Sequence, residues 1–253
     1  MTETRVLSYN VRHADADDGH DRWYNRRDAV GALLGAHAPD VFGLQEALPE
    51  QTAFLADRLP AYRLVDGAPD GHGEGCPIAW RRDRYEAVDD GMFWLSENPD
   101  ADTPAAGWDA RYPRIVVWVR LRGADGDIVV SNTHFDHRGD TAREESARLS
   151  RARLQTIAGD TPLLLLGDLN CTAGTTPHAI LTERLTDAAQ EATVRHGPKT
   201  SLTDFARLLQ DRRIDYILVD GFDVEAFATL ADRDDRGRYP SDHLPVLARL
   251  ARP

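Results

Sequence analysis

The chain carries several short apolar runs that stop abruptly at polar residues. The clearest is residues 163–166, four consecutive leucines, which lead into Gly167-Asp168-Leu169-Asn170. A run this short and this apolar predicts a strand buried on both faces. Side chains two residues apart in an extended backbone point the same way, so Asp168 and Asn170 leave the strand together. The pattern indicates an acid and an amide held rigidly in a cleft, or else a common Asp/Asn turn.

The rest of the chain alternates between strand-like and helix-like patterns. Periodic apolar positions predict helices over residues 26–37, 49–59, 141–158 and 177–185. Strands are expected over residues 5–10, 41–46, 62–65, 77–80, 85–95, 115–121, 128–133, 163–166, 213–219, 224–230 and 244–250. Residues 96–113 read as a long loop, and residues 186–209 carry no clear pattern.

Hairpin signals mix with strand–helix alternation along the chain. This mixture predicts an α/β fold in four layers, an α/β/β/α sandwich of two packed mixed sheets flanked by helices. No linker, repeat or low-complexity tract divides the sequence. We therefore expect one domain over residues 1–253.

Composition narrows the class of protein. Hydrophobic residues make up 42% of the 253 residues and charged residues 28%, which is ordinary for a soluble globular protein. The formal net charge of −12 opposes stable binding to duplex DNA or to anionic membranes. Apolar runs are too short to insert into a membrane, and the N-terminus lacks a signal-peptide core. We expect a cytoplasmic protein and a monomer, whose two cysteines form neither a disulfide framework nor a zinc site.

Polar groups of one kind recur at the ends of the predicted strands. A single carboxylate at a strand end is common, but a repeated set drawn from the whole chain needs a shared explanation. If these ends converge, they form an oxygen-rich cleft of the kind that suits Mg²⁺ or Mn²⁺. Such a site performs metal-assisted hydrolysis of phosphate esters. The set is Asn10, Glu46, His134, Asp168 with Asn170, Asp215, and Asp242 with His243.

The order of these blocks resembles the endonuclease/exonuclease/phosphatase superfamily, which has the deoxyribonuclease I-like fold. The pattern is similar to a bacterial branch whose substrate is not assigned. The matching blocks run from residue 10 to residue 243, namely Asn10, Leu44-Gln-Glu46, Thr133-His134, Gly167-Asp-Leu-Asn170, Arg213-Ile-Asp215-Tyr and Ser241-Asp-His243. The resemblance implies a four-layer sandwich, in agreement with the prediction above.

The resemblance also implies a role for each block. Glu46 resembles the principal metal-binding glutamate, with Asn10 and Asp242 close by, for Mg²⁺ or Mn²⁺. The alternative for Glu46 is an acid that caps the following helix. The expected reaction is in-line attack of water on phosphorus.

Five further residues are implied to be catalytic. Asp168 resembles the acid that orients or deprotonates the attacking water, and Asn170 the amide that binds the scissile phosphate. Asp215 matches the aspartate that pairs with His243, and His134 resembles a second histidine that faces the phosphate. An aspartate partner favours the imidazolium form of His243, although the sequence leaves open whether His243 acts as a base.

Loop residues outside the shared blocks are expected to select the substrate. Glu74 falls where the resemblance places a carboxylate partner of His134. Arg111 could bind a second phosphate or a polar head group, with Trp108 or Tyr112 stacking on a ring.

Two more loop segments are candidates. Asp136 and His137 could form a further polar wall or a second metal site. Residues 23–26 could form the opposite rim of the cleft, or could simply pack.

The expected substrate is a small phosphorylated molecule. We favour a phosphomonoester or phosphodiester of modest size, such as a sugar phosphate or a lipid head group. A nuclease that acts on DNA, RNA or nucleotides is the first alternative. A non-catalytic binding module of the same fold is the second, although that class would be expected to lose signature residues, and all are present.

Overall fold

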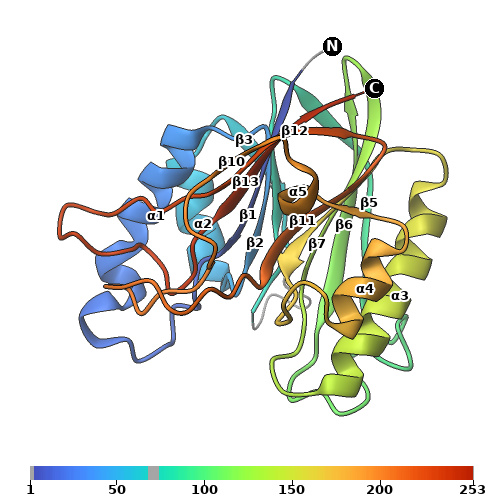
Figure 1. Ribbon diagram of the computed structural model, residues 1–253, viewed down its shortest axis with the longest axis horizontal. Helices are drawn as coiled ribbons and strands as arrows, with labels where there is room; N and C mark the ends of the chain where they lie inside the picture. The colour runs from blue at the N-terminus through green and yellow to red at the C-terminus, as the bar shows by residue number, and fades with distance from the viewer. Residues whose placement is uncertain (1–2, 68–73, 253) are drawn as a thin grey trace.

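The computed structural model describes residues 3–67 and 74–252. Within these ranges, the secondary structure begins with a strand and alternates helices with strands as far as the strand Tyr62–Val65, after which four more strands follow without a helix (Figure 1). These elements are β1 (Thr4–Asn10), the 3-10 helix η1 (Gly19–Asp21), α1 (Trp23–His37), β2 (Val41–Gln45), α2 (Pro49–Arg58), β3 (Tyr62–Val65), β4 (Ile78–Arg81), β5 (Tyr85–Trp94), β6 (Ile115–Gly123) and β7 (Gly126–His134).

The second half contains the longest helix and several very short elements. They are α3 (Asp140–Ala158), β8 (Leu163–Asp168), α4 (Thr176–Thr182), β9 (Thr186–Asp187), α5 (Ala188–Glu191), β10 (Val194–His196), β11 (Asp215–Asp220), β12 (Asp223–Thr229) and β13 (Val246–Ala251). Residues 96–113 form a loop, as the sequence predicts.

Two mixed sheets pack face to face. Within the described residues, one sheet has seven strands in the order β10-β12-β13-β1-β2-β4-β3, and the other has six in the order β5-β6-β7-β8-β11-β9. Figure 1 shows α1 and α2 outside the first sheet and α3 and α4 outside the second. This arrangement confirms the predicted α/β/β/α sandwich.

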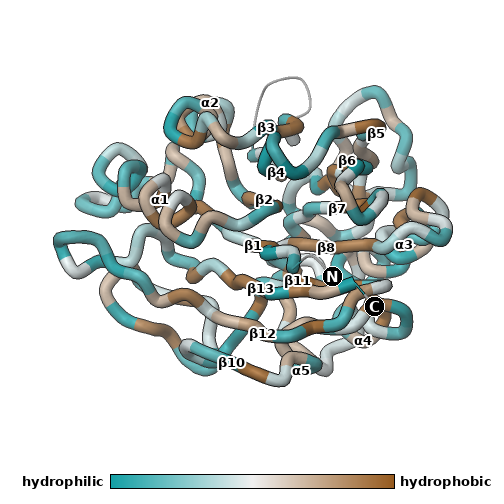
Figure 2. The backbone as a smooth tube through the Cα atoms, turned by 90° about the horizontal axis from the view of Figure 1, so that it is seen from above, coloured by the Kyte–Doolittle hydropathy of each residue, from teal (hydrophilic) through white to brown (hydrophobic). Residues whose placement is uncertain are grey.

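Three apolar clusters fill the spaces between the four layers. The central cluster lies between the sheets and contains side chains such as Val6, Val117 and Leu164. One outer cluster packs α3 and α4 against β8 and its neighbours, and the other packs α1 and α2 against β1 and β2. Figure 2 shows β8 as an apolar stretch near the middle of the molecule. All four leucines of β8 are buried, so the prediction of a strand covered on both faces is confirmed.

The differences from the predicted elements have local causes. Helix α1 begins at Trp23 rather than residue 26, and Arg22 occupies the N-cap position without a side-chain capping hydrogen bond to the described residues. The unassigned segment 186–209 contains β9, α5 and β10, which are two to four residues long. No periodic pattern can emerge over so few residues.

The arrangement of the strands brings polar groups to one end of the sandwich. Parallel pairing places Asn10 of β1 beside Gln45 of β2, directly before Glu46. The first residues of β1 pair with the last strand, Thr4 opposite Leu250, near the marked chain ends in Figure 1. The polar end of β1 therefore faces away from the chain ends.

Candidate active site

Three of the predicted catalytic residues form one row across the second sheet. In the parallel pairing of β7 and β8, His134 lies opposite Asp168. In the antiparallel pairing of β8 and β11, Asp168 lies opposite Asp215. Gly167 allows this approach, because a Cβ atom there would lie 2.4 Å from the Thr133 carbonyl oxygen. The register of three neighbouring strands therefore fixes the row.

The first sheet contributes Asn10 and Glu46 to the same site. The Asn10 amide nitrogen donates to Glu46 Oε1 at 3.0 Å and to Asp168 Oδ2 at 3.1 Å, which links the two sheets. Glu46 follows β2 with a φ of 60°, in the left-handed region that costs a residue with a Cβ atom free energy. The other Glu46 carboxylate oxygen accepts from the backbone N–H of His13 at 3.1 Å.

The segment before the last strand completes the site. Ser241 Oγ donates to the Asn10 carbonyl oxygen at 2.8 Å, which ties this segment to the end of β1. His243 Nδ1 lies 2.9 Å from Asp215 Oδ2, and its Nε2 lies 3.8 Å from Asp168 Oδ2. The structure therefore contains the predicted Asp215–His243 pair and places its histidine beside Asp168.

The two acids and His243 influence one another's protonation. Burial and the neighbouring Asp215 carboxylate raise the pKa of Asp168 to about 7, although His243 opposes this rise. Burial lowers the pKa of His243, but the charge of Asp215, its hydrogen bond and Asp168 together raise that pKa well above the usual range. His243 is therefore an imidazolium near neutral pH, and Asp168 can exchange a proton there.

The pKa of the second histidine, His134, is shifted in the opposite direction. Burial and the nearby Arg114 guanidinium hold the pKa of His134 well below its usual range. Arg114 Nη1 lies 3.0 Å from His134 Nδ1, and Asn170 Nδ2 lies 3.0 Å from His134 Nε2. Asn170 adopts a φ of 48°, held by its backbone N–H donating to Asp168 Oδ1. His134 and Asn170 thus form a neutral polar pair beside Asp168.

Asn10 presents its nitrogen, rather than its oxygen, to the carboxylates. Its Oδ1 accepts from the backbone N–H of Arg12 at 3.0 Å, so its NH₂ group must face Glu46 and Asp168. In this orientation Asn10 donates to both acids. Its role as a metal ligand stays a prediction.

The oxygen donors around Glu46 suit a hard cation. Among the described residues, ligand atoms of His13, Glu46 and Glu74 lie within 4.8 Å of one another, as do those of Asp168, Asp215 and His243. His243 in the second group is already committed to Asp215, which leaves the Glu46 group better suited to an ion. Carboxylate oxygens with water and substrate phosphate are the ligands that Mg²⁺ and Mn²⁺ take.

A pocket of about 490 Å³ opens beside these residues. Glu46 and His134 form part of its wall, so it adjoins both the carboxylate that suits a metal and the polar pair. Carboxylates of Asp15 and Glu74 and the rings of Trp94 and Tyr112 line the remainder. This volume lies in the range of ordinary small-molecule sites, which span roughly 300–1,000 Å³.

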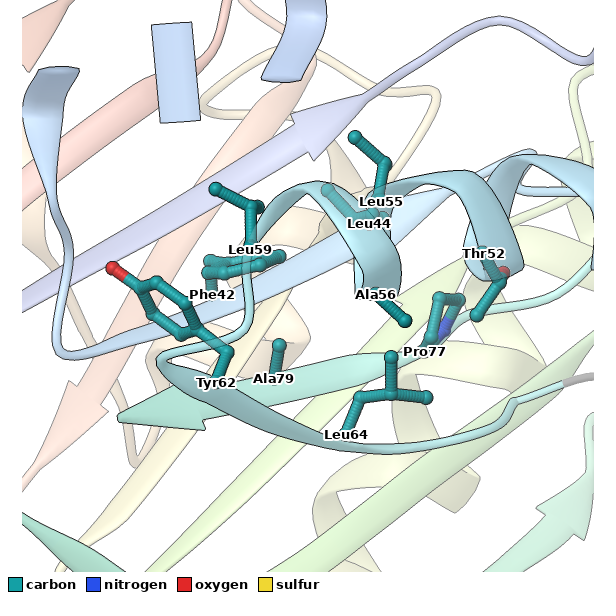
Figure 3. A pocket seen from close by; sticks show the side chains of 10 residues that line it. All are labelled: Phe42, Leu44, Thr52, Leu55, Ala56, Leu59, Tyr62, Leu64, Pro77 and Ala79. Atoms are coloured by element: carbon teal, nitrogen blue, oxygen red, sulfur yellow. The ribbon is translucent and has the colours of Figure 1, made fainter. Parts of the chain in front are cut away.

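A second, apolar hollow lies away from the site. It measures about 20 Å³ and is enclosed between α2 and the strands β2, β3 and β4 (Figure 3). Ten side chains line it, namely Phe42, Leu44, Thr52, Leu55, Ala56, Leu59, Tyr62, Leu64, Pro77 and Ala79. It contains none of the predicted site residues and is a packing gap under α2.

Comparison with known proteins identifies the family. The family model described as the endonuclease/exonuclease/phosphatase family matches residues 7–243. A mannosyl-6-phosphatase structure from Bacteroides thetaiotaomicron is 31% identical, with 98% of this chain and 99% of that chain aligned at a TM-score of 0.92. The chain belongs to the endonuclease/exonuclease/phosphatase family.

Other known proteins align over the whole chain or part of it. A family structure from Bacteroides vulgatus is 31% identical, covers 100% of both chains and has a TM-score of 0.92. The human Nocturnin catalytic domain, at 17% identity and a TM-score of 0.78, shares the fold. An uncharacterised mimivirus protein is 26% identical over 66% of each chain. Membership supports hydrolysis of phosphate esters as the activity of this protein.

Of the loop residues predicted to bind substrate or stack on it, some line the pocket and others do not. Tyr112 lines the pocket, with its ring stacked on His137 at 5.9 Å. Arg111 packs over the same ring at 5.5 Å, and the backbone N–H of Trp108 donates to Glu97. Neither Arg111 nor Trp108 is among the residues that line the pocket.

Asp136 holds the loop together. Its carboxylate accepts four backbone hydrogen bonds, from Arg111, Tyr112, Arg138 and Gly139. These donors occupy the acceptor positions of both oxygens, so a polar wall or a second metal site at Asp136 is not supported.

Glu74 does not pair directly with His134 in this family member. Its Oε2 lies 3.9 Å from His134 Nδ1 but accepts from Arg114 Nη1 at 2.9 Å. Arg114 therefore stands between the two residues that the resemblance paired.

Sequence reasoning missed three polar side chains of this site. They are Arg114, His13 and Asp15, which lie in loops before or after strands. Arg114 has one sequence signal, because it is a charge directly before the buried run of β6. His13 and Asp15 lie in a polar loop that shows no such signal.

Arg26 was a candidate for the rim and is instead fully buried. Its guanidinium donates to the carbonyl oxygens of Asp21, Val11, Arg12 and Pro240. The last two of these carbonyls belong to loops that flank Asn10 and Ser241. Arg26 therefore packs behind the site and joins two of its loops.

None of the described helices combines the length and the apolar character needed to cross a bilayer.

Proposed function

We propose that the protein is a divalent-metal-dependent phosphatase that removes a phosphoryl group from a sugar phosphate or a similar small polyol phosphate. The pocket beside Glu46 and His134 is the observation that carries this proposal. Carboxylates accept hydrogen bonds from hydroxyl groups, and aromatic rings pack on the C–H faces of a sugar. The similarity to a mannosyl-6-phosphatase over nearly the full chain supports the same class.

The phosphoryl group would lie between the polar pair and His243. His134 and Asn170 donate hydrogen bonds to its oxygens, and the His243 imidazolium, held by Asp215, stabilises the charge that develops on them. Asp168 orients the attacking water and accepts its proton, for which a pKa of about 7 is well matched.

The residues that would hold the cation are Glu46, His13 and Glu74, whose ligand atoms lie within 4.8 Å of one another. Asp242 is a further ligand by the family resemblance alone. When bound, Mg²⁺ or Mn²⁺ supplies positive charge to phosphoryl oxygens and to the leaving oxygen. Asn10 keeps both Glu46 and Asp168 oriented through its NH₂ group.

One set of assays tests this proposal. The purified protein is treated with EDTA and then supplied with Mg²⁺ or Mn²⁺, and phosphate release is measured from a panel of hexose and polyol phosphates. Parallel reactions contain bis-p-nitrophenyl phosphate and single-stranded DNA. We expect metal-dependent release from sugar phosphates, at least tenfold faster than diester cleavage. Faster cleavage of the diester or of DNA would contradict the monoesterase and favour the nuclease alternative.

A further inference from the structure

Arg114 is a buried arginine at the floor of the pocket, directly before β6. Its side chain is 8% exposed, and one nitrogen, Nη1, lies close to two partners. These are Glu74 Oε2 at 2.9 Å and His134 Nδ1 at 3.0 Å. Arg114 Nε is buried and has no hydrogen-bond partner among the described residues. Contacts with Glu74, with His134 and with the Tyr112 ring, whose centroid lies 5.9 Å from Cζ, hold this guanidinium.

The chemistry of the two partners determines where the His134 proton lies. A guanidinium has only donors, so the contact at 3.0 Å requires His134 Nδ1 to accept. A neutral imidazole carries its single proton on the other nitrogen, which is Nε2. A carboxylate in the place of Arg114 would demand a proton on Nδ1 instead. The low pKa of His134 agrees with this neutral form.

The Nε2–H group then lies between Asp168 Oδ2, at 3.5 Å from Nε2, and the amide of Asn170. Asn170 Nδ2 lies 3.0 Å from His134 Nε2 and also donates to the Phe135 carbonyl oxygen at 2.9 Å. The bond to Phe135 fixes the orientation of the amide, because only its nitrogen can donate. Two N–H donors this close are best satisfied by one oxygen that accepts from both. An oxygen of a phosphoryl group meets that requirement.

We propose that Arg114 is a positioning residue that fixes His134 in the neutral, Nε2-protonated form, so that His134 and Asn170 act as a paired donor for one phosphoryl oxygen. This inference rests on the proposed function for the identity of the oxygen. The hydrogen-bond arrangement itself does not depend on that function.

Nitrogen NMR of the histidine rings in the full-length, metal-free protein tests the arrangement directly, since it reports which ring nitrogen carries the proton. His134→Asn identifies the signal. Arg114→Met removes the donor and the charge, whereas Arg114→Gln keeps one N–H donor without the charge. Arg122→Met, at an exposed arginine of β6, is the matched control.

We expect His134 to be protonated at Nε2 in the unaltered protein, in Arg114→Gln and in Arg122→Met. Arg114→Met should show a mixture with protonation at Nδ1. With a sugar phosphate substrate, Arg114→Met should lower kcat about 100-fold with little change in KM, as for the loss of one aligned donor. Arg114→Gln should recover at least about tenfold of that loss.

Two results would overturn the inference. One is a proton on Nδ1 in the unaltered protein, and the other is an unchanged His134 signal in Arg114→Met. An Arg114→Gln enzyme no faster than Arg114→Met would show that charge, rather than ring orientation, matters. If the protein released no phosphate from any ester, the proposed function would fail, yet the NMR result would still decide the role of Arg114.

Discussion

The two histidines of the site differ in charge because their partners differ. His243 pairs with a carboxylate, Asp215, and is held as an imidazolium. His134 faces a guanidinium, Arg114, and is held neutral. In the proposed site, neutral His134 would donate a hydrogen bond to the phosphoryl group, whereas cationic His243 on the other side would also neutralise its negative charge. This division is set by single residues and not by the fold.

The buried carboxylate of Asp168 should lower the free energy of unfolding of the metal-free protein, although catalysis requires it. Its pKa is raised from 3.8 to about 7, so the folded state binds more protons than the unfolded state between these pH values. Stability from this group is therefore present at low pH and is lost as the pH rises toward 7. Asp168→Asn should abolish phosphate release and yet raise the melting temperature at pH 8.

The effect of Asp168→Asn on stability can be compared at two pH values. At pH 5 Asp168 is protonated in the folded protein but mostly ionised in the unfolded protein, so Asp168→Asn should raise the melting temperature by less than at pH 8. At pH 8 we expect a gain of about 1–2 kcal/mol, or roughly 2–8 °C for a chain of this size. Calorimetry of both proteins with EDTA measures this difference, and an equal effect at the two pH values would contradict it.

Residues of the candidate site could be predicted from the sequence where they end buried strands, but not where they lie in loops. Glu46, Asp168 and His243 could be found because each adjoins an apolar run. Arg114 could not be distinguished from other loop arginines, because its role depends on contacts with residues 20 and 40 positions away. The orientation of the Asn10 amide likewise depends on a backbone N–H that no sequence pattern reveals.

At the scale of elements, strand register converts sequence positions into a site. The pairing of β7, β8 and β11 aligns His134, Asp168 and Asp215 in one row. Long elements such as α3 and β8 were predictable because they repeat a pattern over several turns or pleats. The short elements β9, α5 and β10 were not, because tertiary contacts rather than periodicity define them.

Helix α1 should depend on Arg26 more than on its apolar face alone. Arg26→Met removes the donor to three buried carbonyl oxygens, those of Asp21, Val11 and Pro240, and we expect a loss of about 3–5 kcal/mol. Urea unfolding followed by circular dichroism measures this loss. Arg63→Met on the exposed edge of β3 is the control and should have little effect. A similar small effect at Arg26 would show that the carbonyls find other donors.

Gly43 on β2 should be required for the sheets to approach. A Cβ atom there would lie 2.7 Å from the side chain of Asn132 on β7. Gly43→Ala should therefore displace Asn132, and we expect a loss of about 2–3 kcal/mol. Gly35→Ala in α1 is the matched control, since its Cβ would meet Leu59 at an ordinary 3.8 Å. That change should stabilise the helix by up to about 1 kcal/mol, and thermal unfolding of the pair distinguishes the two cases.

At the scale of the molecule, the site belongs to both sheets at once. Glu46 and Asn10 come from the first sheet, and His134 and Asp168 come from the second. Behind the site, Gln45 donates to Asn132 at 2.7 Å and Asn132 donates to the Leu44 carbonyl at 2.7 Å, which joins the sheets. We therefore expect the two sheets to unfold together as one domain.

A bound cation should stabilise the whole molecule. At a concentration about 100 times its dissociation constant, Mg²⁺ or Mn²⁺ should add about 2.7 kcal/mol and shift one melting transition upward. Glu46→Gln should remove this shift, and Glu225→Gln on the exposed face of β12 should retain it. Calorimetry with and without metal measures the shift. Two separate transitions, or an equal shift in Glu46→Gln, would contradict this view of the site.

The direction of β1 has a practical consequence. Thr4 pairs with Leu250 at one end of the sandwich, while Asn10 lies at the other end of the same strand. Seven residues of strand separate these ends by about 20 Å. A tag, a fusion partner or a solid support attached near Thr4 or Leu250 would therefore leave the mouth of the cleft open. Immobilised protein should accept substrates as freely as protein in solution.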